Sequence, residues 1–225
     1  MINQRLKCIL AQIKQAEITY NRKAGDVLLL AVSKTKTAQA IAQAYRAGQR
    51  HFGENYYQEA LKKQKELGAY DITWHFIGPI QSNKIKAIAT HFSWVHSIDS
   101  LKIAKRLSEQ RPVSLAPLNV CLQVNISGEQ SKSGIALHEL PEMCALVSAL
   151  PNITLRGVMA MPEPEEDFEL QRQPFKTLYQ AVTRLNNFKL DTYSFGMSSD
   201  LHAAIAEGAT IVRIGTALFG AREYA

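Results

Sequence analysis

Eight short apolar segments recur along the chain, and a segment with helical periodicity separates each of them from the next. Short apolar runs bounded by polar residues are typical of strands that are buried on both faces, as in parallel sheets. Strict alternation of strands and helices favours parallel pairing, because parallel strands need a long crossover connection. The predicted strands are Leu28–Val32, His51–Glu54, Trp74–Gly78, Trp94–Ile98, Asn119–Ile126, Ile153–Met161, Thr192–Gly196 and Ile211–Gly215.

An additional amphipathic helix is expected before the first strand, over residues 2–19. Its apolar face comprises Ile2, Leu6, Ile9, Leu10 and Ile13. Pro174 is expected to kink the helix after the sixth strand or to mark its true start, because proline lacks the backbone N–H that a helix interior uses. Further helices are expected after Thr37, from about Gln58, from Ser82 or Asn83, from Asp99 or Ser100 through Leu107, over 138–149 and over Leu201–Glu207.

The alternation predicts the α/β class and, within it, a closed (β/α)8 TIM barrel. Eight strand–helix units close on themselves in that fold, and 225 residues is within its usual size. An open doubly wound sheet is the alternative. It should carry GxGxxG after its first strand, where this chain has AVSKTKT. Pro112 and Pro117 mark a loop, because the alternation resumes after them, so we expect a single domain over residues 1–225.

Cysteine usage and hydropathy bear on location. The first residues, MINQRLKC, lack the apolar run of a signal peptide, and no stretch approaches the roughly 18 apolar residues of a membrane span. Cys8, Cys121 and Cys144 are odd in number and widely spaced, which argues against a disulfide framework or a zinc knuckle. We therefore expect a cytoplasmic protein with no membrane partner.

The net charge of +6 raises the question of nucleic-acid binding. The basic side chains are distributed over several helical segments and form no single tract, and no RNA-binding signature accompanies them. We interpret them as solvated helix faces with a mild preference for anions, and expect no nucleic-acid partner. They are Lys62, Lys63, Lys65, Lys84, Lys86, Lys102, Lys105 and Arg106.

Candidate site residues follow from the predicted fold, because ligands of such barrels bind at the carboxyl ends of the strands. One further candidate, Arg213, lies inside the last strand. The strand ends supply Lys34, Asn55, Gly78, Asn125, Met159, Ser198, Ser199, Gly215 and Thr216.

Lys34 lies at the carboxyl end of the predicted strand Leu28–Val32, a run of five apolar residues, after Ser33. Burial in a partly dry pocket lowers the pKa of a lysine, because it disfavours the ammonium form. A neutral amine can condense with an aldehyde to form a Schiff base. The alternative is a lysine whose side chain extends out of the barrel mouth into water.

The loops after the seventh and eighth strands, GMSSD and RIGT, are candidates for a phosphate site. Barrels often bind phosphate there, at a helix N-terminus. Ser198, Ser199 and Thr216 offer hydroxyl groups, and Gly215 permits close approach of the backbone. Plain helix capping is the alternative. Pyridoxal phosphate is one ligand that requires both an amine and a phosphate site.

Arg213 suits the same ligand, since it could donate a hydrogen bond to the pyridine nitrogen. An arginine is always charged, so it would keep that nitrogen unprotonated and the ring a weak electron sink. That would disfavour carbanion chemistry such as transamination. A structural ion pair within the barrel is the alternative.

Other polar residues give weaker signals. The acidic loop at 163–167 is interpreted as solvated, and Lys132 as an exposed loop lysine, although it could be a second amine near the mouth. No GxSxG or P-loop motif occurs. The histidines lack the spacing of metal ligands and are interpreted as satisfied core or surface residues; they are His51, His75, His91, His96, His138 and His202.

Seven segments together resemble one family, the pyridoxal phosphate homeostasis proteins (YggS/PROSC family). That family is similar to the N-terminal barrel of alanine racemase, a fold-type III pyridoxal phosphate enzyme. The resemblance extends from about Leu28 to Tyr224. The segments are AVSKTK at 31–36, HFGENYYQE at 51–59, WHFIGPIQSNK at 74–84, SKSG at 131–134, RGVMAMP at 156–162, FGMSSD at 195–200 and VRIGTALFGAR at 212–222.

The resemblance implies that Lys34 holds pyridoxal 5'-phosphate covalently as an aldimine. By motif match, Arg213 would contact the pyridine nitrogen and Asn55 the surroundings of the ring. The phosphate residues would be Ser198, Ser199, Gly215 and Thr216. Members of the family are regarded as cofactor carriers or regulators of vitamin B6 and amino-acid balance, without established turnover.

A carrier and an enzyme remain distinct hypotheses. A two-base racemase needs a second acid/base, which in alanine racemase is a tyrosine from a C-terminal domain acting across a dimer. This chain ends at Ala225, shortly after the eighth strand, so we expect no such domain. We expect a monomeric, non-catalytic carrier that delivers the cofactor to apo-enzymes. The alternative is a small amino-acid racemase or lyase with a base from the barrel or from a partner chain.

Overall fold

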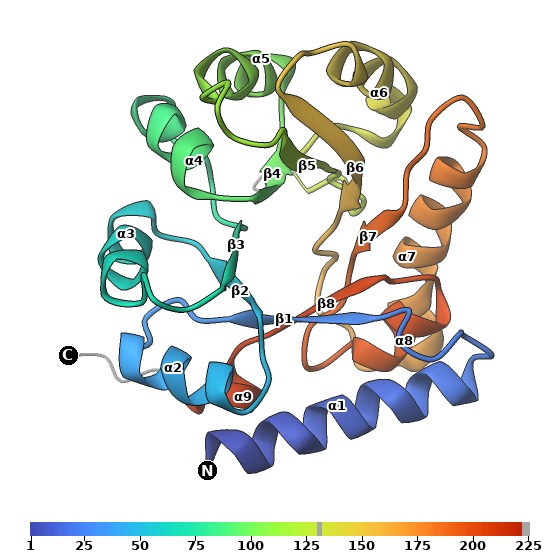
Figure 1. Cartoon of the computed structure of the whole chain (residues 1–225). Helices are drawn as coiled ribbons and strands as arrows, with labels where there is room; N and C mark the ends of the chain where they lie inside the picture. The colour runs from blue at the N-terminus through green and yellow to red at the C-terminus, as the bar shows by residue number, and fades with distance from the viewer. Residues whose placement is uncertain (130–131, 222–225) are drawn as a thin grey trace.

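The computed structural model describes residues 1–129 and 132–221, and within these ranges eight parallel strands form a closed barrel (Figure 1). The strands follow one another around the barrel in chain order, which confirms the predicted (β/α)8 architecture. They are β1 (Leu28–Val32), β2 (His51–Glu54), β3 (Thr73–Phe76), β4 (Trp94–Ile98), β5 (Leu118–Gln123), β6 (Ile153–Met159), β7 (Thr192–Ser194) and β8 (Ile211–Ile214).

The barrel closes between β1 and β8, which pair in parallel with Leu28 opposite Ile211 and Ala31 opposite Ile214. On its other side β1 pairs with β2 through Ala31 and Phe52. Because all strands run in the same direction, their carboxyl ends meet at one rim. Residues that follow β1 and β8 therefore lie side by side, although most of the chain separates them.

Helices surround the strands and bury their apolar faces against them (Figure 1). Their bounds are α1 (Ile2–Thr19), α2 (Ala38–Arg46), α3 (Tyr57–Glu66), α4 (Ile85–His91), α5 (Leu101–Gln110), α6 (Leu140–Ser148), α7 (Phe168–Thr183), α8 (Leu201–Ala206) and α9 (Thr216–Phe219), with short 3-10 turns η1 (Ser82–Lys84) and η2 (Leu137–Glu139).

The additional helix α1 packs against α2, α8 and α9 next to the β1–β8 closure (Figure 1). Leu6, Ile9 and Ile13 are buried as predicted, whereas Leu10 is 45% exposed, so its predicted place on the buried face is wrong. The buried Glu17 accepts hydrogen bonds from the backbone N–H of Val27 (2.9 Å) and of Gly25 (3.2 Å). These bonds tie the end of α1 to the start of β1.

Several predicted boundaries differ from the structure. β5 and β6 end at Gln123 and Met159, before the predicted ends, because the ladder stops while the apolar pattern continues. The helix α7 begins at Phe168, where Asp167 caps it by accepting from the Leu170 N–H (2.9 Å). Pro174 therefore lies inside the helix and does not mark its start.

In the described ranges, no helix has the length and apolar character that crossing a membrane requires. Cys8, Cys121 and Cys144 are free thiols, in agreement with the absence of a disulfide framework expected from their spacing. The acidic loop at residues 163 and 165–167 is exposed, as expected.

Truncating a buried residue of α1 should show how strongly this helix stabilises the barrel. Leu6 is only 1% exposed, so we expect Leu6→Ala to lower the free energy of unfolding in urea by about 2–4 kcal/mol. Leu10→Ala is the matched control on the same helix, with an expected change under about 0.5 kcal/mol. Equal effects of the two substitutions would contradict the assigned packing.

Candidate functional site

A cavity of about 330 Å³ opens at the carboxyl rim of the barrel. All seven residues proposed from sequence as cofactor ligands line it: Lys34, Asn55, Ser198, Ser199, Arg213, Gly215 and Thr216. Sequence analysis did not single out the other lining residues, although most lie within a few residues of a strand end. They are Val32, Lys36, Ile77, Met161, Met197 and Gly220.

The remaining strand-end candidates lie elsewhere. Asn125 lines an adjoining cavity of about 360 Å³, which shares Asn55, Ile77, Met161 and Met197 with the first. Met159 is 1% exposed and is part of β6. Gly78 has a packing role, because a Cβ there would lie 2.2 Å from the Asn55 carbonyl oxygen.

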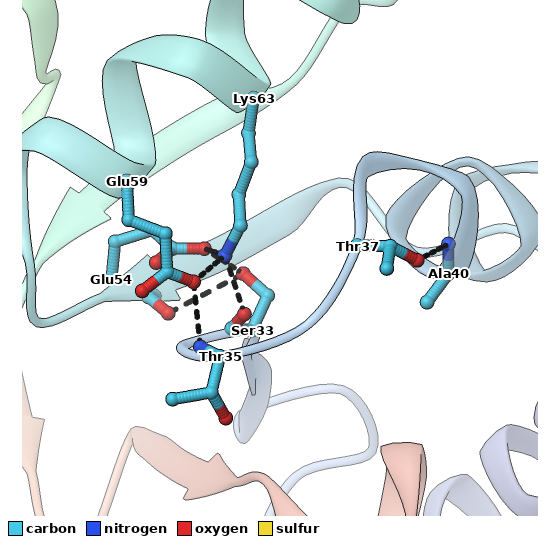
Figure 2. Close-up of polar contacts among 8 residues, drawn as sticks. Ser33, Thr35, Thr37, Ala40, Glu54, Glu59 and Lys63 are labelled. Carbon is cyan, nitrogen blue, oxygen red and sulfur yellow. Dashed lines mark hydrogen bonds and ion pairs between the residues drawn. The ribbon is translucent and has the colours of Figure 1, made fainter. Parts of the chain in front are cut away.

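Lys34 follows β1, and its two neighbours in the chain are held by a polar cluster from β2 and α3 (Figure 2). Lys63 on α3 donates to the carbonyl oxygen of Ser33 (2.7 Å), and its Nζ lies 2.8 Å from Oε1 of Glu54. Glu59 Oε1 accepts from the Thr35 N–H (2.6 Å) and pairs with the Lys63 Nζ (2.5 Å). The cluster thus fixes the backbone on both sides of Lys34.

Two further features constrain this segment. Ser33 Oγ donates to Glu54 Oε1 at 2.6 Å, so hydroxyl, carboxylate and ammonium form one network. Thr35 has a φ of 63°, in the left-handed region that non-glycine residues rarely adopt. Such a conformation persists only where surrounding contacts impose it, as the Glu59 hydrogen bond does here.

Burial raises the pKa of the Glu54 carboxyl above its ordinary value, and the neighbouring Lys63 counteracts that rise. Glu54 is 0% and Lys63 5% exposed. The interpretation of Lys63 as part of a solvated helix face is therefore wrong. The side chain turns inward because Glu54 of β2, the Ser33 carbonyl oxygen after β1 and Glu59 of the same helix provide acceptors for the ammonium group.

The loop after β7 presents Ser198 and Ser199 to the cavity. It turns at Gly196, whose φ is +83° and where a Cβ would lie 2.6 Å from the Cβ of Ala204, so only glycine fits. The Met197 N–H donates to Asp200 Oδ1 at 2.6 Å. Within the described part of the chain, the backbone N–H groups of Ser198 and Ser199 have no acceptor. They remain available to an anion.

The loop after β8 is a tight turn into α9, a short helix that sequence analysis did not predict. Gly215 is the N-cap of this helix, and its carbonyl accepts from the Leu218 and Phe219 N–H groups (3.0 and 2.9 Å). Thr216 is the first residue of α9. The Lys36 Nζ donates to the Ala221 carbonyl at 2.5 Å and so ties the segment after α9 to the β1 loop.

Arg213 is 5% exposed and lines the cavity from β8. Its Nη1 donates to the Ser194 carbonyl and, at 2.9 Å, to Ser194 Oγ, and its Nη2 donates to the Ala160 carbonyl (3.0 Å). Burial lowers its pKa to about 10, so it stays a cation at neutral pH. No carboxylate among residues 1–129 and 132–221 pairs with it, and the structural ion pair considered for Arg213 is therefore absent there.

The histidines form no metal-binding group among the described residues. Lys132 differs from expectation, since it is half-buried and lines the adjoining cavity. It pairs with Glu129, and Asn125 Nδ2 holds its loop at the mouth by donating to the carbonyls of Glu129 (2.7 Å) and Lys132 (3.2 Å). Ser131 of the SKSG segment, together with Arg222 and Tyr224, lies outside the described residues.

Removing the cation from the cluster should destabilise the protein in a pH-dependent way. Breaking a buried pair costs about 3–5 kcal/mol, so Lys63→Met should lower the free energy of unfolding by about that amount. The Glu54 pKa lies above its ordinary 4.5, so stability falls as pH rises through the raised value. Without Lys63 that pKa rises further, and the variant should lose more stability than wild type between about pH 5 and about pH 8.

Urea unfolding of wild type and variant at both pH values measures this difference. Lys62→Met is the matched control, since Lys62 is exposed on the same helix. A Lys63→Met variant with the wild-type pH dependence would show that Lys63 does not compensate the buried Glu54 carboxylate.

Comparison with known proteins places this arrangement in a family. The family model described as "Alanine racemase, N-terminal domain" matches residues 10–223. The "Pyridoxal phosphate homeostasis protein" of Pseudomonas aeruginosa is 58% identical over 223 residues, which cover 99% of this chain and 96% of that protein.

Solved structures agree with this assignment. PipY of Synechococcus elongatus, described as with PLP bound, superposes with a TM-score of 0.86 at 36% identity and covers 98% of this chain and 100% of that one. Alanine racemase of Corynebacterium glutamicum shares the fold, with a TM-score of 0.74 at 17% identity over 98% of this chain and 61% of that one. With its barrel, its rim cavity and these similarities, the chain belongs to the family of pyridoxal phosphate homeostasis proteins.

Proposed function

We propose that this protein binds pyridoxal 5'-phosphate in the rim cavity and serves intracellular vitamin B6 homeostasis by holding and delivering the cofactor, with an influence on amino-acid balance. One observation carries the proposal: a single cavity combines the Lys34 amine, two loops rich in donors and a buried arginine. These groups match the aldehyde, the phosphate and the ring nitrogen of one ligand. The PLP-bound structure of PipY supports the same ligand class.

Each group of residues would hold a different part of the cofactor. The Ser198 and Ser199 N–H groups lack acceptors among the described residues, which suits a phosphate dianion. Gly215 and Thr216 would complete the phosphate site from the β8 side, and Asn55 would lie beside the ring. When bound, the cofactor supplies an aldehyde carbon to which one amine can add in place of another. Lys34 would supply the resident amine.

Arg213 would contact the ring nitrogen. Its guanidinium donates to Ser194 and Ala160, which leaves further N–H groups of this cavity-lining side chain to donate to a ligand. Since it remains a cation, it can donate to the nitrogen but cannot accept a proton from it. The ring would stay unprotonated, which suits storage of the cofactor better than stabilisation of a carbanion.

The lining also favours a carrier over an enzyme. Among its described residues the titratable groups are Lys34, Lys36 and Arg213, and none is a carboxyl, imidazole, phenol or thiol. A racemase needs an acid and a base with pKa values near the working pH on opposite faces of the substrate. A small racemase or lyase remains the second candidate, because Asp99 and Lys132 line the adjoining cavity.

The proposal includes the setting in which the protein would act. We infer a cytoplasmic, monomeric, single-domain carrier that passes the cofactor to apo-enzymes. Free thiols at Cys8, Cys121 and Cys144 agree with a reducing compartment. Delivery requires neither a nucleic acid nor a membrane, because the incoming amine of a recipient enzyme could take the cofactor over from Lys34.

Borohydride reduction tests the site directly. After incubation with pyridoxal phosphate, reduction and peptide mass mapping should place a stable pyridoxyl group on the peptide that contains Lys34. The Lys34→Ala variant should carry none, and Lys62→Ala, which changes an exposed lysine, should label like wild type. Labelling of another lysine in wild type, or none, would contradict the assignment.

Single-enantiomer amino acids separate a carrier from an enzyme. We expect a spectral change of at most one equivalent per Lys34, with no conversion of L-alanine or L-serine to the other enantiomer or to a keto acid. Chiral chromatography and keto-acid assays measure both. Sustained turnover that is lost in Lys34→Ala would establish the racemase or lyase alternative.

A further inference from the structure

A string of polar side chains crosses the inside of the barrel and ends at Arg213. His51 Nδ1 lies 3.0 Å from His75 Nε2, and His75 Nδ1 lies 2.9 Å from His96 Nε2. His96 Nδ1 lies 2.8 Å from Ser194 Oγ, which accepts from Arg213 Nη1 at 2.9 Å. β4 and β7 are not neighbours in the barrel, so the His96–Ser194 contact spans its interior.

The two ends of the string differ. Arg213 lines the rim cavity, whereas His51 is the first residue of β2, at the amino end of the strands, and is half-buried. Between them His75, His96 and Ser194 are at most 1% exposed. The string therefore connects the candidate site with the opposite face of the barrel through groups that water does not reach.

All three imidazoles are neutral near pH 7. Burial, followed by the positive charge of Arg213, lowers the pKa of His96 to about 3. Burial also lowers the pKa of His75 well below its ordinary value, and to a smaller extent that of His51. A neutral imidazole has one N–H donor and one acceptor nitrogen, so each ring passes a hydrogen bond in one direction only.

The cation at the end of the string decides that direction. Arg213 can only donate, so Ser194 Oγ accepts from it and keeps its own proton to donate. If Ser194 donates to His96 Nδ1, His96 donates through Nε2–H to His75, and His75 through Nε2–H to His51. In this order the acceptor nitrogen of each ring faces the positive charge of Arg213. The reverse order would point N–H groups toward that charge and leave the Ser194 hydroxyl proton without an acceptor in the string.

We propose that His51, His75, His96 and Ser194 form a proton-ordered string that positions Arg213 toward the ring nitrogen of the bound cofactor. All four are positioning residues, because they act through Arg213. The identity of the ligand in this inference rests on the proposed function. The order of the protons along the string does not depend on that function. No carboxylate among residues 1–129 and 132–221 forms an ion pair with Arg213, although the charge of Asp200 acts on it from a greater distance. The groups that contact the guanidinium are neutral and oriented toward it.

The first experiment uses the unmodified protein without added ligand. Long-range proton–nitrogen NMR correlation at neutral pH distinguishes the two tautomers and the imidazolium form of each histidine. We expect His51, His75 and His96 all to be neutral and protonated on Nε2. An Nδ1-protonated ring or an imidazolium at His75 or His96 would overturn the proposed order, whether or not the protein binds pyridoxal phosphate.

The second experiment tests whether the string acts through the ring nitrogen. Apparent affinities are measured for pyridoxal phosphate and for its 1-deaza analogue, in which a C–H replaces that nitrogen. We expect Ser194→Ala to reduce the preference for pyridoxal phosphate over the analogue by about tenfold, since one charge-assisted hydrogen bond loses its support. The affinity for the analogue should change less than about twofold.

Ser108→Ala is the matched control, because Ser108 is also buried and hydrogen-bonded but belongs to α5. It should leave the preference unchanged. An unchanged preference in Ser194→Ala, or equal losses for both ligands, would show that the string only stabilises the barrel. If wild type binds neither ligand at Lys34, the proposed function fails, while the NMR result still decides the order of the string.

Discussion

The hydrogen bonds between β1 and β8 are the contacts on which the rest of the molecule depends, because they close the barrel. They place Lys34 from the start of the chain beside Arg213, Gly215 and Thr216 from its end, and all four line one cavity. The site therefore does not exist in any partly formed sheet. The helix α1 packs next to the closure and protects it, which explains why an additional helix outside the eight repeated units belongs to the structure.

The two sides of the cavity are held in different ways. On the β1 side, charged groups from β2 and α3 fix the backbone around Lys34, and one ammonium group faces two carboxyl groups. On the β8 side, a single cation is surrounded by carbonyl groups, a hydroxyl and neutral rings. The proposed roles match this difference, because an amine that would bond covalently needs a fixed backbone, whereas a donor to a ring nitrogen would need a fixed direction.

Sequence reasoning predicted the fold and seven of the residues that line the cavity, because both follow from periodicity and from the position of residues at strand ends. Lys34, Asn55 and Ser198 could be placed at the rim once eight strands had been counted. The ends of the strands were harder to predict, since apolar residues continue beyond the last hydrogen bond of the ladder in β5 and β6. The helix α9 was missed because its four residues are too short to show a period.

The interior networks could not be predicted, because their members lie far apart in the sequence. His51, His75 and His96 come from three successive strands, and no short motif marks them. In the sequence, Lys63 cannot be told from a solvated lysine on a helix. Only the position of α3 next to the end of β2 shows that its ammonium group is enclosed. Such pairings depend on the tertiary structure and not on local pattern.

The neutral imidazoles inside the barrel also give the protein an acid limit. Unfolded, each histidine would take up a proton near its ordinary pKa of 6.5, which the native environment prevents. Below that pH the unfolded chain gains up to about 1.4 kcal/mol per pH unit for each such ring relative to the native state. Unfolding in mild acid thus takes up protons, so the free energy of unfolding falls as the pH drops below the ordinary histidine pKa.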